Sequence, residues 1–497
     1  MPGVKDNPID PGWFEQVFGF SEAPLSASST ELPQALGTAA GDSRLAAARW
    51  RRQYTSTKTR FRFDDGVLHV RDTGASFHVG SFELASLEEL YARRRALGGG
   101  SRSASASASA PPKLSFRHAA GAGAGDAQLE PGNAGAVFQV FSLFNCLETT
   151  PTSPPEEGVS RYAREATQGA VCAATCPAAT VFRNYFVNGS GQAGGQQLDC
   201  LEGIAQVLGN NEQHLWTMSN GFCLPTKADT IPRLSRRLKF DKELAERARQ
   251  QLQVGVHWDT EVLGGEHRVC QVFCSALPVG LVKRVKSTDW EPFAALVLRG
   301  AYEATLAAAA LLSAQRAGTR VPVFLTLLGG GAFGNRQKWI MEAIEAALVK
   351  FRDEPLDVVL LHPKEVPKDR CWQELGFGRE PEVISGVVKT LDHADLAGEM
   401  QRELQGLRAS LCSRGAIAVD DVGAVLRRLD VNRDGVIDGD ELESLVLWMD
   451  SCAGQVVKAD ADGNGTIHYT EFCAWLCDED PAIVNRMLAA ASLYDVR

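Results

Sequence analysis

The sequence lacks any run of 18 consecutive apolar residues, and its first ten residues, Met1–Asp10, are mostly polar. A bilayer-spanning helix needs about 20 mostly apolar residues, and a secretory signal needs an apolar core. The longest uncharged stretch, 131–147, carries Asn, Gln and Ser and is too polar to span a bilayer. We therefore expect no membrane span and a cytoplasmic location.

A basic surface is also missing. The formal net charge is −10, and residues 420–480 alone hold 15 Asp and Glu against 4 Lys and Arg, a balance of −11. The rest of the chain is therefore close to neutral, which excludes the basic face of a nucleic-acid-binding protein. The acidity is concentrated in the segment where a hard cation would find its ligands.

The twelve cysteines lack the spacing of a zinc site or of a small disulfide-rich protein. Three pairs are spaced i,i+4: Cys172/Cys176, Cys270/Cys274 and Cys473/Cys477. Each pair lies in an apolar segment, and no second pair stands at zinc-site spacing. We expect reduced thiols that serve as small core side chains.

The length of 497 residues, with 44% hydrophobic residues, predicts two or three domains. The clearest boundary is a Gly-, Ser- and Ala-rich linker between Gly98 and Pro112. The expected organisation is a helix and hairpin unit (1–97), this flexible linker (98–112), an α/β domain (113–363), a helical connector (364–418) and an EF-hand pair (419–497).

The fold class expected for the central region is α/β, because strand patterns alternate with helical ones. The predicted strands are Ala136–Phe144, Phe182–Val187, Val254–Val262, Val269–Leu277, Val321–Leu328 and Leu356–Leu361. The predicted helices are Lys242–Leu252, Phe293–Arg316 and Lys338–Phe351. In the N-terminal α+β unit, Asp65-Gly66 predicts a tight hairpin and Ser86 with Glu89 a capping box.

Two twelve-residue segments near the C-terminus have the pattern of EF-hand calcium loops, and flanking helices complete an all-α module. The ligand positions of the first loop are Asp430, Asn432, Asp434, Val436 (through its carbonyl), Asp438 and Glu441. Those of the second are Asp460, Asp462, Asn464, Thr466, His468 and Glu471. We therefore expect two Ca²⁺ sites.

His468 is the one departure from the usual loop pattern, and its position commonly acts through water. Ile437 and Ile467 occupy equivalent positions and are expected to pair the loops in a short antiparallel ladder. The pair suits a sensor, with a Kd of about 10⁻⁷ to 10⁻⁵ M, or a buffer. The apolar residues of 442–449 would form either a groove for a target helix or the core of the module.

A glycine-rich loop, Gly329-Gly330-Gly331-Ala332-Phe333-Gly334-Asn335, joins a predicted strand to a predicted helix. Glycines allow close approach of a phosphate, and free N–H groups at a helix start favour anions, so a diphosphate is the natural ligand. A dinucleotide-binding oxidoreductase is an alternative, although this loop lies late in the domain and no acidic residue closes the next strand. A glycine turn needed only for tight packing is another.

The loop resembles the second phosphate loop of macrodomains, which wraps the diphosphate and distal ribose of ADP-ribose. Other segments resemble one branch, the macrodomain-like ADP-ribosyl-arginine hydrolases. They are Phe138–Val140, Phe144–Glu148, Gly158–Tyr162, Thr167–Gly169, Arg183–Phe186, His257–Glu261 and Phe273–Pro278. The resemblance implies a three-layer α/β/α domain, ADP-ribose as ligand or product, and hydrolysis of the bond between ribose and arginine.

That hydrolysis needs a carboxylate to activate water and a second to bind or protonate the guanidinium. Asp259 and Glu261 alternate on one predicted strand, so they form either a pocket-facing pair or two surface acids. Glu148 is a third candidate, or a solvated Glu. Asn145 is expected to reach the ribose, although a turn Asn explains it equally well.

The sequence thus predicts a calcium-binding protein with a central ADP-ribose domain that removes ADP-ribose from arginine under calcium control. The expected partners are calcium, ADP-ribose or an ADP-ribosylated protein, and a protein target of the EF-hand pair. The alternative is a non-catalytic, calcium-dependent binding or scaffold protein with a degenerate α/β domain.

Overall fold

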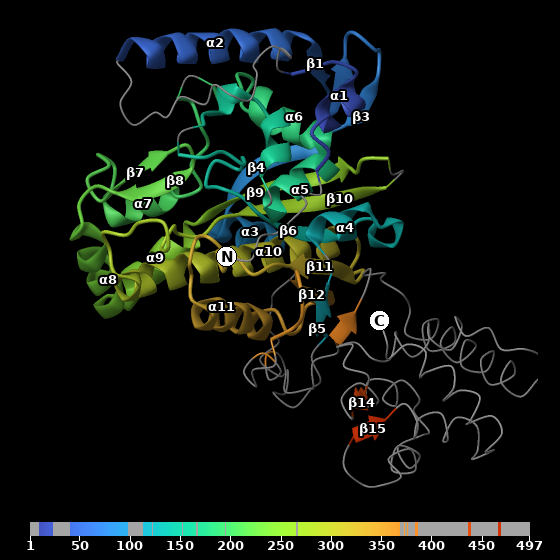
Figure 1. Cartoon of the computed structure of the whole chain (residues 1–497). Coiled ribbons are helices and arrows are strands. Elements are labelled where there is room, and N and C mark those ends of the chain that lie inside the picture. The colour runs from blue at the N-terminus through green and yellow to red at the C-terminus, as the bar shows by residue number, and fades with distance from the viewer. Residues whose placement is uncertain are drawn as a thin grey trace, which may run out of the picture. The chain divides into compact units, whose positions relative to one another are not determined.

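The computed structural model describes residues 9–22, 40–97, 113–121, 123–151, 153–165, 167–193, 195–264, 267–367, 372, 375, 383–385, 436–438 and 466–468. Two compact units divide the chain, Met1–Thr390 and Leu391–Arg497. Figure 1 shows the first unit as a layered α/β domain. The predicted linker at 98–112 lies outside the described residues.

An eight-stranded sheet forms the centre of the first unit, in the order β13-β5-β12-β11-β6-β10-β9-β4. The strands from β13 to β10 pair in parallel, whereas β9 is antiparallel to β10, and β4 is antiparallel to β9. Their bounds are β4 Ser81–Ser86, β5 Ser115–Ala120, β6 Val137–Phe141, β9 Gln253–Glu261, β10 Arg268–Cys274, β11 Val321–Leu325, β12 Leu356–His362 and β13 Val383–Ser385. This mixed α/β sheet confirms the expected fold class.

Helices cover both faces of the sheet, as the three-layer expectation requires (Figure 1). One layer is built around α10, which contacts its companions α3, α8, α9 and α11. The helices of this layer are α3 Leu87–Ala96, α8 Thr230–Phe240, α9 Lys242–Gln250, α10 Glu291–Gln315 and α11 Gln337–Lys350. The other layer holds α4 Ala124–Leu129, α5 Gln168–Thr175 and α6 Pro177–Tyr185.

The central helix α10 is apolar on almost all sides because it is enclosed by the sheet and the neighbouring helices. Within the described residues, the segment Ser287–Gln315 is the one stretch long and apolar enough to cross a membrane, but 83% of its apolar window is buried in the domain. A core helix of a folded domain passes the same test of length and composition. Its composition is therefore explained by its place in the core.

The N-terminal residues contribute to the main sheet as well as forming a small unit. The hairpin of β1 Phe61–Asp64 and β2 Val67–Val70 turns at Asp65 and Gly66, which both have positive φ, and β3 Ser76–His78 extends it. A second apolar cluster joins this sheet to α1 Trp13–Phe18, α5 and α6, and α2 Ala40–Thr59 packs nearby. The capping box of Ser86 and Glu89 opens α3 as predicted. The expected boundary at residue 97 nevertheless places β4 and α3 in a separate unit. In the structure, β4 is a strand of the main sheet and α3 belongs to the helical layer around α10.

One predicted strand is wrong. Phe182–Val187 belongs to α6 and the turn after it, not to a strand. Pro177 stands in the first turn of α6, where its missing N–H costs nothing, and the helix is buried on most sides. An apolar run of this length reads equally well as a buried strand or a buried helix.

The remaining elements of the first unit connect these layers. They are the hairpin β7 Trp216–Ser219 and β8 Phe222–Pro225, the helix α7 Glu202–Leu208, and the 3₁₀ turns η1 Pro131–Asn133, η2 Pro155–Glu157, η3 Ser160–Arg164 and η4 Ser287–Trp290. The expected helical connector at 364–418 contains β13, which pairs with β5 and so belongs to the main sheet.

The second unit is described at two short strands, β14 Val436–Asp438 and β15 Thr466–His468. They pair antiparallel, with Ile437 opposite Ile467. This register confirms the predicted ladder between the two segments predicted as EF-hand loops.

Candidate functional site

The carboxyl ends of β6 and β11 mark the point where the chain leaves the sheet in opposite directions. After β6 the chain leads to α5 and α6 on one face, and after β11 it leads to α11 on the other. The two strands pair only at Val137 with Val323 and Phe138 with Phe324, and then separate. In open α/β sheets, ligands bind outside the carboxyl ends of the strands at such a switch point.

Gln168 satisfies the backbone of β6 where β11 has diverged. Its side-chain Oε1 accepts a hydrogen bond from the Phe141 N–H at 2.7 Å, and its Nε2 donates to the Gln139 carbonyl at 3.3 Å. Buried N–H and C=O groups without partners would destabilise the fold. The end of β6 is therefore stable on the side where β11 has separated, while β10 pairs with its other side.

The predicted glycine loop follows β11 and is held in shape by Asn335. The buried Asn335 amide donates to the Leu277 carbonyl at 2.9 Å, and its backbone N–H donates to the Gly329 carbonyl at 2.9 Å. Gly329 has a φ of 68°, and an added Cβ would lie 2.5 Å from the Cβ of Ala276. Gly329 and Asn335 thus have structural roles in closing the loop.

The tip of the loop is open. Gly330, Gly331 and Ala332 are exposed, and an added Cβ at Gly331 would meet no atom within 4 Å. Gly334, with a φ of 66°, lies against the backbone of Gly280, where an added Cβ would stand 2.8 Å from its Cα. The tip can therefore approach a ligand closely, while its ends are fixed.

Phe333 is buried rather than presented at the tip. Its ring packs edge-to-face on Phe141 at 5.1 Å between centroids and against Phe222 at 5.7 Å. Phe141 ends β6 and Phe222 begins β8, so the glycine loop is joined to the loops of both elements. These contacts bring the ends of β6 and β11 into one site.

Glu148 is the predicted catalytic residue that lies at this edge. Its side chain is buried, and burial raises the pKa of its carboxyl to about 8, opposed by a hydrogen bond from Ser142 and by the charges of Arg183 and Arg161. An added Cβ at Gly169 would overlap the Phe141 carbonyl oxygen and stand 2.5 Å from Glu148 Oε1. The Glu148 carboxyl group therefore lies beside the end of β6. Because its pKa is close to neutral pH, both its protonated and its deprotonated form are accessible there.

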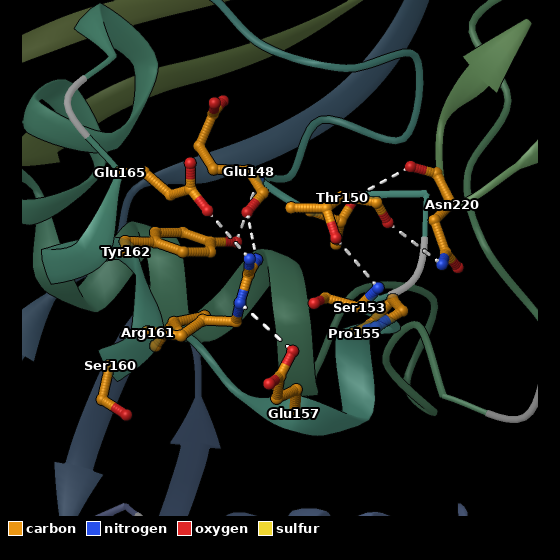
Figure 2. Close-up of polar contacts among 12 residues, drawn as sticks. Glu148, Thr150, Ser153, Pro155, Glu157, Ser160, Arg161, Tyr162, Glu165 and Asn220 are labelled. Atoms are coloured by element: carbon orange, nitrogen blue, oxygen red, sulfur yellow. Dashed lines mark hydrogen bonds and ion pairs between the residues drawn. The ribbon is translucent and has the colours of Figure 1, made fainter. Parts of the chain in front are cut away.

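The main chain of Glu148 is fixed by the second and third residues of η3. Arg161 donates to the Glu148 carbonyl at 2.7 Å, and the Glu148 N–H donates to the Tyr162 hydroxyl at 3.1 Å. Arg161 is held in turn by ion pairs with Glu157 at 3.2 Å and Glu165 at 3.0 Å. Figure 2 shows the Glu148 side chain pointing away from this cluster.

A buried guanidinium supports the turn before Glu148. Arg183 in α6 donates from Nε to the Cys146 carbonyl at 3.2 Å and from NH2 to the Thr180 hydroxyl at 3.1 Å. Cys146 has a φ of 59°, a conformation that an L residue adopts only when its surroundings hold it. Arg183 thus stabilises the backbone that carries Glu148.

Asn145 is a turn residue. Its Oδ1 accepts from the Leu147 N–H at 3.1 Å, its Nδ2 donates to Gln197 at 2.9 Å, and its side chain is fully buried. With these partners the amide shapes the loop after β6. The structure therefore shows Asn145 in a turn role, and its contact with a ribose stays a prediction.

Asp259 and Glu261 do not join this site. Their strand runs antiparallel to β10, and Glu261 pairs with Arg268 at the beginning of β10, the edge opposite to its carboxyl end. Asp259 is exposed, has a φ of 53°, forms an ion pair with Arg268 at 2.9 Å, and lies 3.3 Å from His78 Nε2. Glu261 accepts from the His78 N–H at 2.8 Å. The expected carboxylate pair and the glycine loop thus lie at opposite edges of the sheet.

The calcium ligands fall mostly outside the described residues. Val436, Asp438, Thr466 and His468 lie on the paired strands, whose backbone is described, while the other eight predicted ligands do not. In the described part of the chain, no three His, Cys, Asp or Glu side chains gather as a metal site. The described members of the cysteine pairs, Cys172/Cys176 and Cys270/Cys274, are free and buried, as expected of core side chains.

Comparison with known proteins assigns one segment to a family. The EF-hand family matches residues 422–447, which include the first predicted calcium loop. No curated protein matches the chain. The chain is similar in structure to poly(ADP-ribose) glycohydrolase from Thermomonospora curvata, with 14% identity, 66% of this chain and 97% of that chain covered, and a TM-score of 0.28.

A second similar structure is poly(ADP-ribose) glycohydrolase from Deinococcus radiodurans in complex with ADP-ribose. It is 13% identical, covers 66% of this chain and 95% of its own, and has a TM-score of 0.29. TM-scores this low carry no argument about this chain. The proposed function therefore rests on the residues of this chain and on the family resemblance of its sequence segments.

Four residues that shape the site were not predicted as site residues. They are Gln168, Arg161, Tyr162 and Arg183, which bond to the backbone of the segment from Gln139 to Glu148. Each lies in a segment on which the family resemblance depends. Their role could not be predicted, since side chains that bond to a backbone carbonyl or N–H leave no spacing pattern in the sequence.

Proposed function

We propose that the carboxyl edge of β6 and β11 binds ADP-ribose and hydrolyses its glycosidic bond to an arginine side chain. The observation that carries the proposal is a buried carboxylate, Glu148, at the edge where an open glycine loop follows the neighbouring strand. The exposed backbone of Gly330 and Gly331 suits a diphosphate, which requires close approach and N–H donors. The arginine linkage follows from the family resemblance.

In the proposed reaction, Glu148 acts as the general base and then returns its proton. The carboxylate accepts a proton from a water molecule, whose oxygen forms a bond to C1″ of the distal ribose. The bond from C1″ to the guanidine nitrogen breaks, with its electron pair passing to that nitrogen, which takes the proton from Glu148. The products are ADP-ribose and free arginine, with no oxidant or reductant required.

Turnover by the Glu148→Gln variant tests the catalytic assignment. We expect release of ADP-ribose from an ADP-ribosylated arginine peptide to fall by about 10²- to 10⁴-fold, because general base catalysis is lost. Calorimetry should show that ADP-ribose still binds the variant. Undiminished turnover would remove Glu148 from the mechanism.

A reader or scaffold without turnover is the second candidate function. It is favoured by the position of Asp259 and Glu261, because no second carboxylate from the predicted set accompanies Glu148. ADP-ribose binding by the wild-type chain without turnover of arginine-, serine- or glutamate-linked substrates would support it. Binding of NAD⁺ in preference to ADP-ribose would instead support the oxidoreductase.

We infer that both EF-hand loops bind calcium and that the ion controls the first unit. The matched EF-hand segment contains six oxygen-ligand positions of the kind calcium prefers. The antiparallel pairing of β14 with β15 is the arrangement in which two such loops support each other. Chelation of calcium should therefore change ADP-ribose affinity or turnover. Identical values in calcium and in chelator would exclude regulation of the first unit by calcium.

A further inference from the structure

Glu22, from the N-terminal segment, is a buried carboxylate that no part of the proposed mechanism uses. Its Oε1 accepts hydrogen bonds from the Val159 N–H at 3.0 Å and the Tyr185 hydroxyl at 2.5 Å. Its Oε2 accepts from the Ser160 N–H at 2.5 Å. Burial raises the pKa of Glu22, and these three donors oppose the shift. Donors of this number around one carboxylate form a specific receptor for it.

The receptor depends on a glycine. Gly158 has a φ of 92°, and an added Cβ would stand 2.5 Å from the carboxyl carbon of Glu22. Only a residue without a Cβ allows the carboxylate to come this close to the Val159 and Ser160 N–H groups. The Gly158–Val159–Ser160 turn is thus shaped around the Glu22 side chain.

The same turn leads directly into the residues that hold Glu148. Arg161 follows Ser160 and donates to the Glu148 carbonyl, and Tyr162 accepts from the Glu148 N–H. The N–H and carbonyl groups of Glu148 are therefore both bonded to residues that lie within two positions of Ser160. Figure 2 shows the contacts of Arg161 and Tyr162 with Glu148.

We propose that Glu22 is a positioning residue for Glu148 and that it acts through the Gly158–Tyr162 turn. This inference rests on the proposed function of Glu148. By fixing Val159 and Ser160, the Glu22 carboxylate sets the register of Arg161 and Tyr162, and these place the main chain from which the catalytic carboxyl extends. The N-terminal segment is in this way part of the active-site support.

The segment that carries Glu22 has an anchor of its own. Trp13, Phe14 and Phe18 are buried in the second apolar cluster, and Trp13 Nε1 donates to the Ser160 carbonyl at 3.4 Å. Removing the Glu22 carboxylate therefore empties the receptor without releasing the whole segment. This allows the role of the carboxylate to be measured in a folded protein.

Chemical rescue of the Glu22→Ala variant in the full chain tests the proposal. We expect kcat to fall by about 10- to 100-fold, because small displacements of a catalytic group cost rates of that order, with ADP-ribose affinity changed by less than about threefold. Formate, a carboxylate small enough for the vacated space, should restore part of the rate, and chloride at equal ionic strength should not. Asp10→Ala, which removes an exposed carboxylate of the same segment, is the matched control and should respond to neither salt.

A kcat for Glu22→Ala equal to that of the wild type would overturn the proposal, as would a loss that formate does not reverse. Should the wild-type chain show no turnover, the proposed function fails, and the positioning role is then measured by carboxyl carbon NMR. The Glu148 resonance is assigned by comparison with Glu148→Gln. A formate-reversible change in its titration midpoint in Glu22→Ala would support the role, and an unchanged midpoint would reject it.

Discussion

The Glu148 carboxylate lies against the backbone of Gly169, so closely that an added Cβ at residue 169 would stand 2.5 Å from Glu148 Oε1. The same Cβ would overlap the carbonyl oxygen of Phe141 at the end of β6. Gly169 is the second residue of α5, and its lack of a side chain lets this helix approach both the strand end and the carboxyl. The Glu148 carboxyl group is therefore confined by packing, not by an ion pair.

Gly169→Ala should displace Glu148 and lower stability. Overpacking of a close backbone contact costs about 1–3 kcal/mol, which urea unfolding would measure as a lower midpoint. Turnover should fall more than the fraction of folded protein does, because the methyl group acts directly on Glu148. A variant with wild-type stability and rate would show that α5 is not fixed against β6.

The stability of the chain should depend on pH through Glu148. Since burial raises the folded-state pKa to about 8 from an ordinary value of 4.5, the fold favours the neutral carboxyl. This contribution is fully present below the ordinary pKa and is lost as the pH rises through about 8. Glu148→Gln should therefore gain stability relative to wild type between pH 5 and pH 9.

The gain should reach a few kcal/mol, because one pKa unit corresponds to about 1.4 kcal/mol. Thermal unfolding of both proteins across this range measures it. Glu342→Gln, an exposed glutamate in an i,i+4 pair, is the matched control and should show no such trend. A stability difference that is constant with pH would mean that Glu148 is not desolvated.

Gly331→Ala separates binding from folding. An added Cβ at Gly331 meets no atom within 4 Å, so stability should change by less than about 0.5 kcal/mol. If the loop tip receives a diphosphate, the methyl group should weaken ADP-ribose binding by about tenfold, or 1.4 kcal/mol. Calorimetry measures the affinity, with Gly12→Ala as a control outside the loop. Unchanged affinity would place the ligand elsewhere.

Glu441→Gln and Glu471→Gln should each remove one calcium ion. The glutamate at the last position of an EF-hand loop binds bidentately, and an amide cannot replace it. Titration should give two ions for the wild type, one for each single variant and none for the double variant. Because β14 and β15 share backbone hydrogen bonds, the remaining site should also weaken in the single variants.

Elements with a strong local pattern could be predicted from the sequence. The central strands β9, β10, β11 and β12 and the helices α10 and α11 each begin within two residues of prediction. The pairing of Ile437 with Ile467 was predicted because loop positions fix it. Glu148 was predicted because it follows the predicted strand Ala136–Phe144 and lies in a segment that carries the family resemblance, but a solvated Glu was an alternative interpretation of the pattern.

Features set by tertiary contacts could not be predicted. Asp259 lies at an irregularity of the pairing between β9 and β10 and has a positive φ, which breaks the alternation on which its pairing with Glu261 depended. The segment Phe182–Val187 was predicted as a strand because burial on most sides of α6 obscures the helical periodicity of its apolar side chains. Gln168 bonds to backbone groups of β6 that are unpaired only because β11 diverges from β6. The spacing of residues in the sequence does not indicate this divergence.

The Gln168 side chain also bears on whether the edge formed by β6 and β11 is open before a ligand binds. Because the Gln168 amide bonds to the β6 backbone groups that β11 leaves unpaired, the separation of β6 from β11 needs no ligand to satisfy these groups. The separation is then a product of folding, and ADP-ribose would meet an edge that needs no rearrangement to receive it. Association should proceed in a single kinetic phase whose rate rises linearly with ligand concentration, without the plateau of a slow opening step.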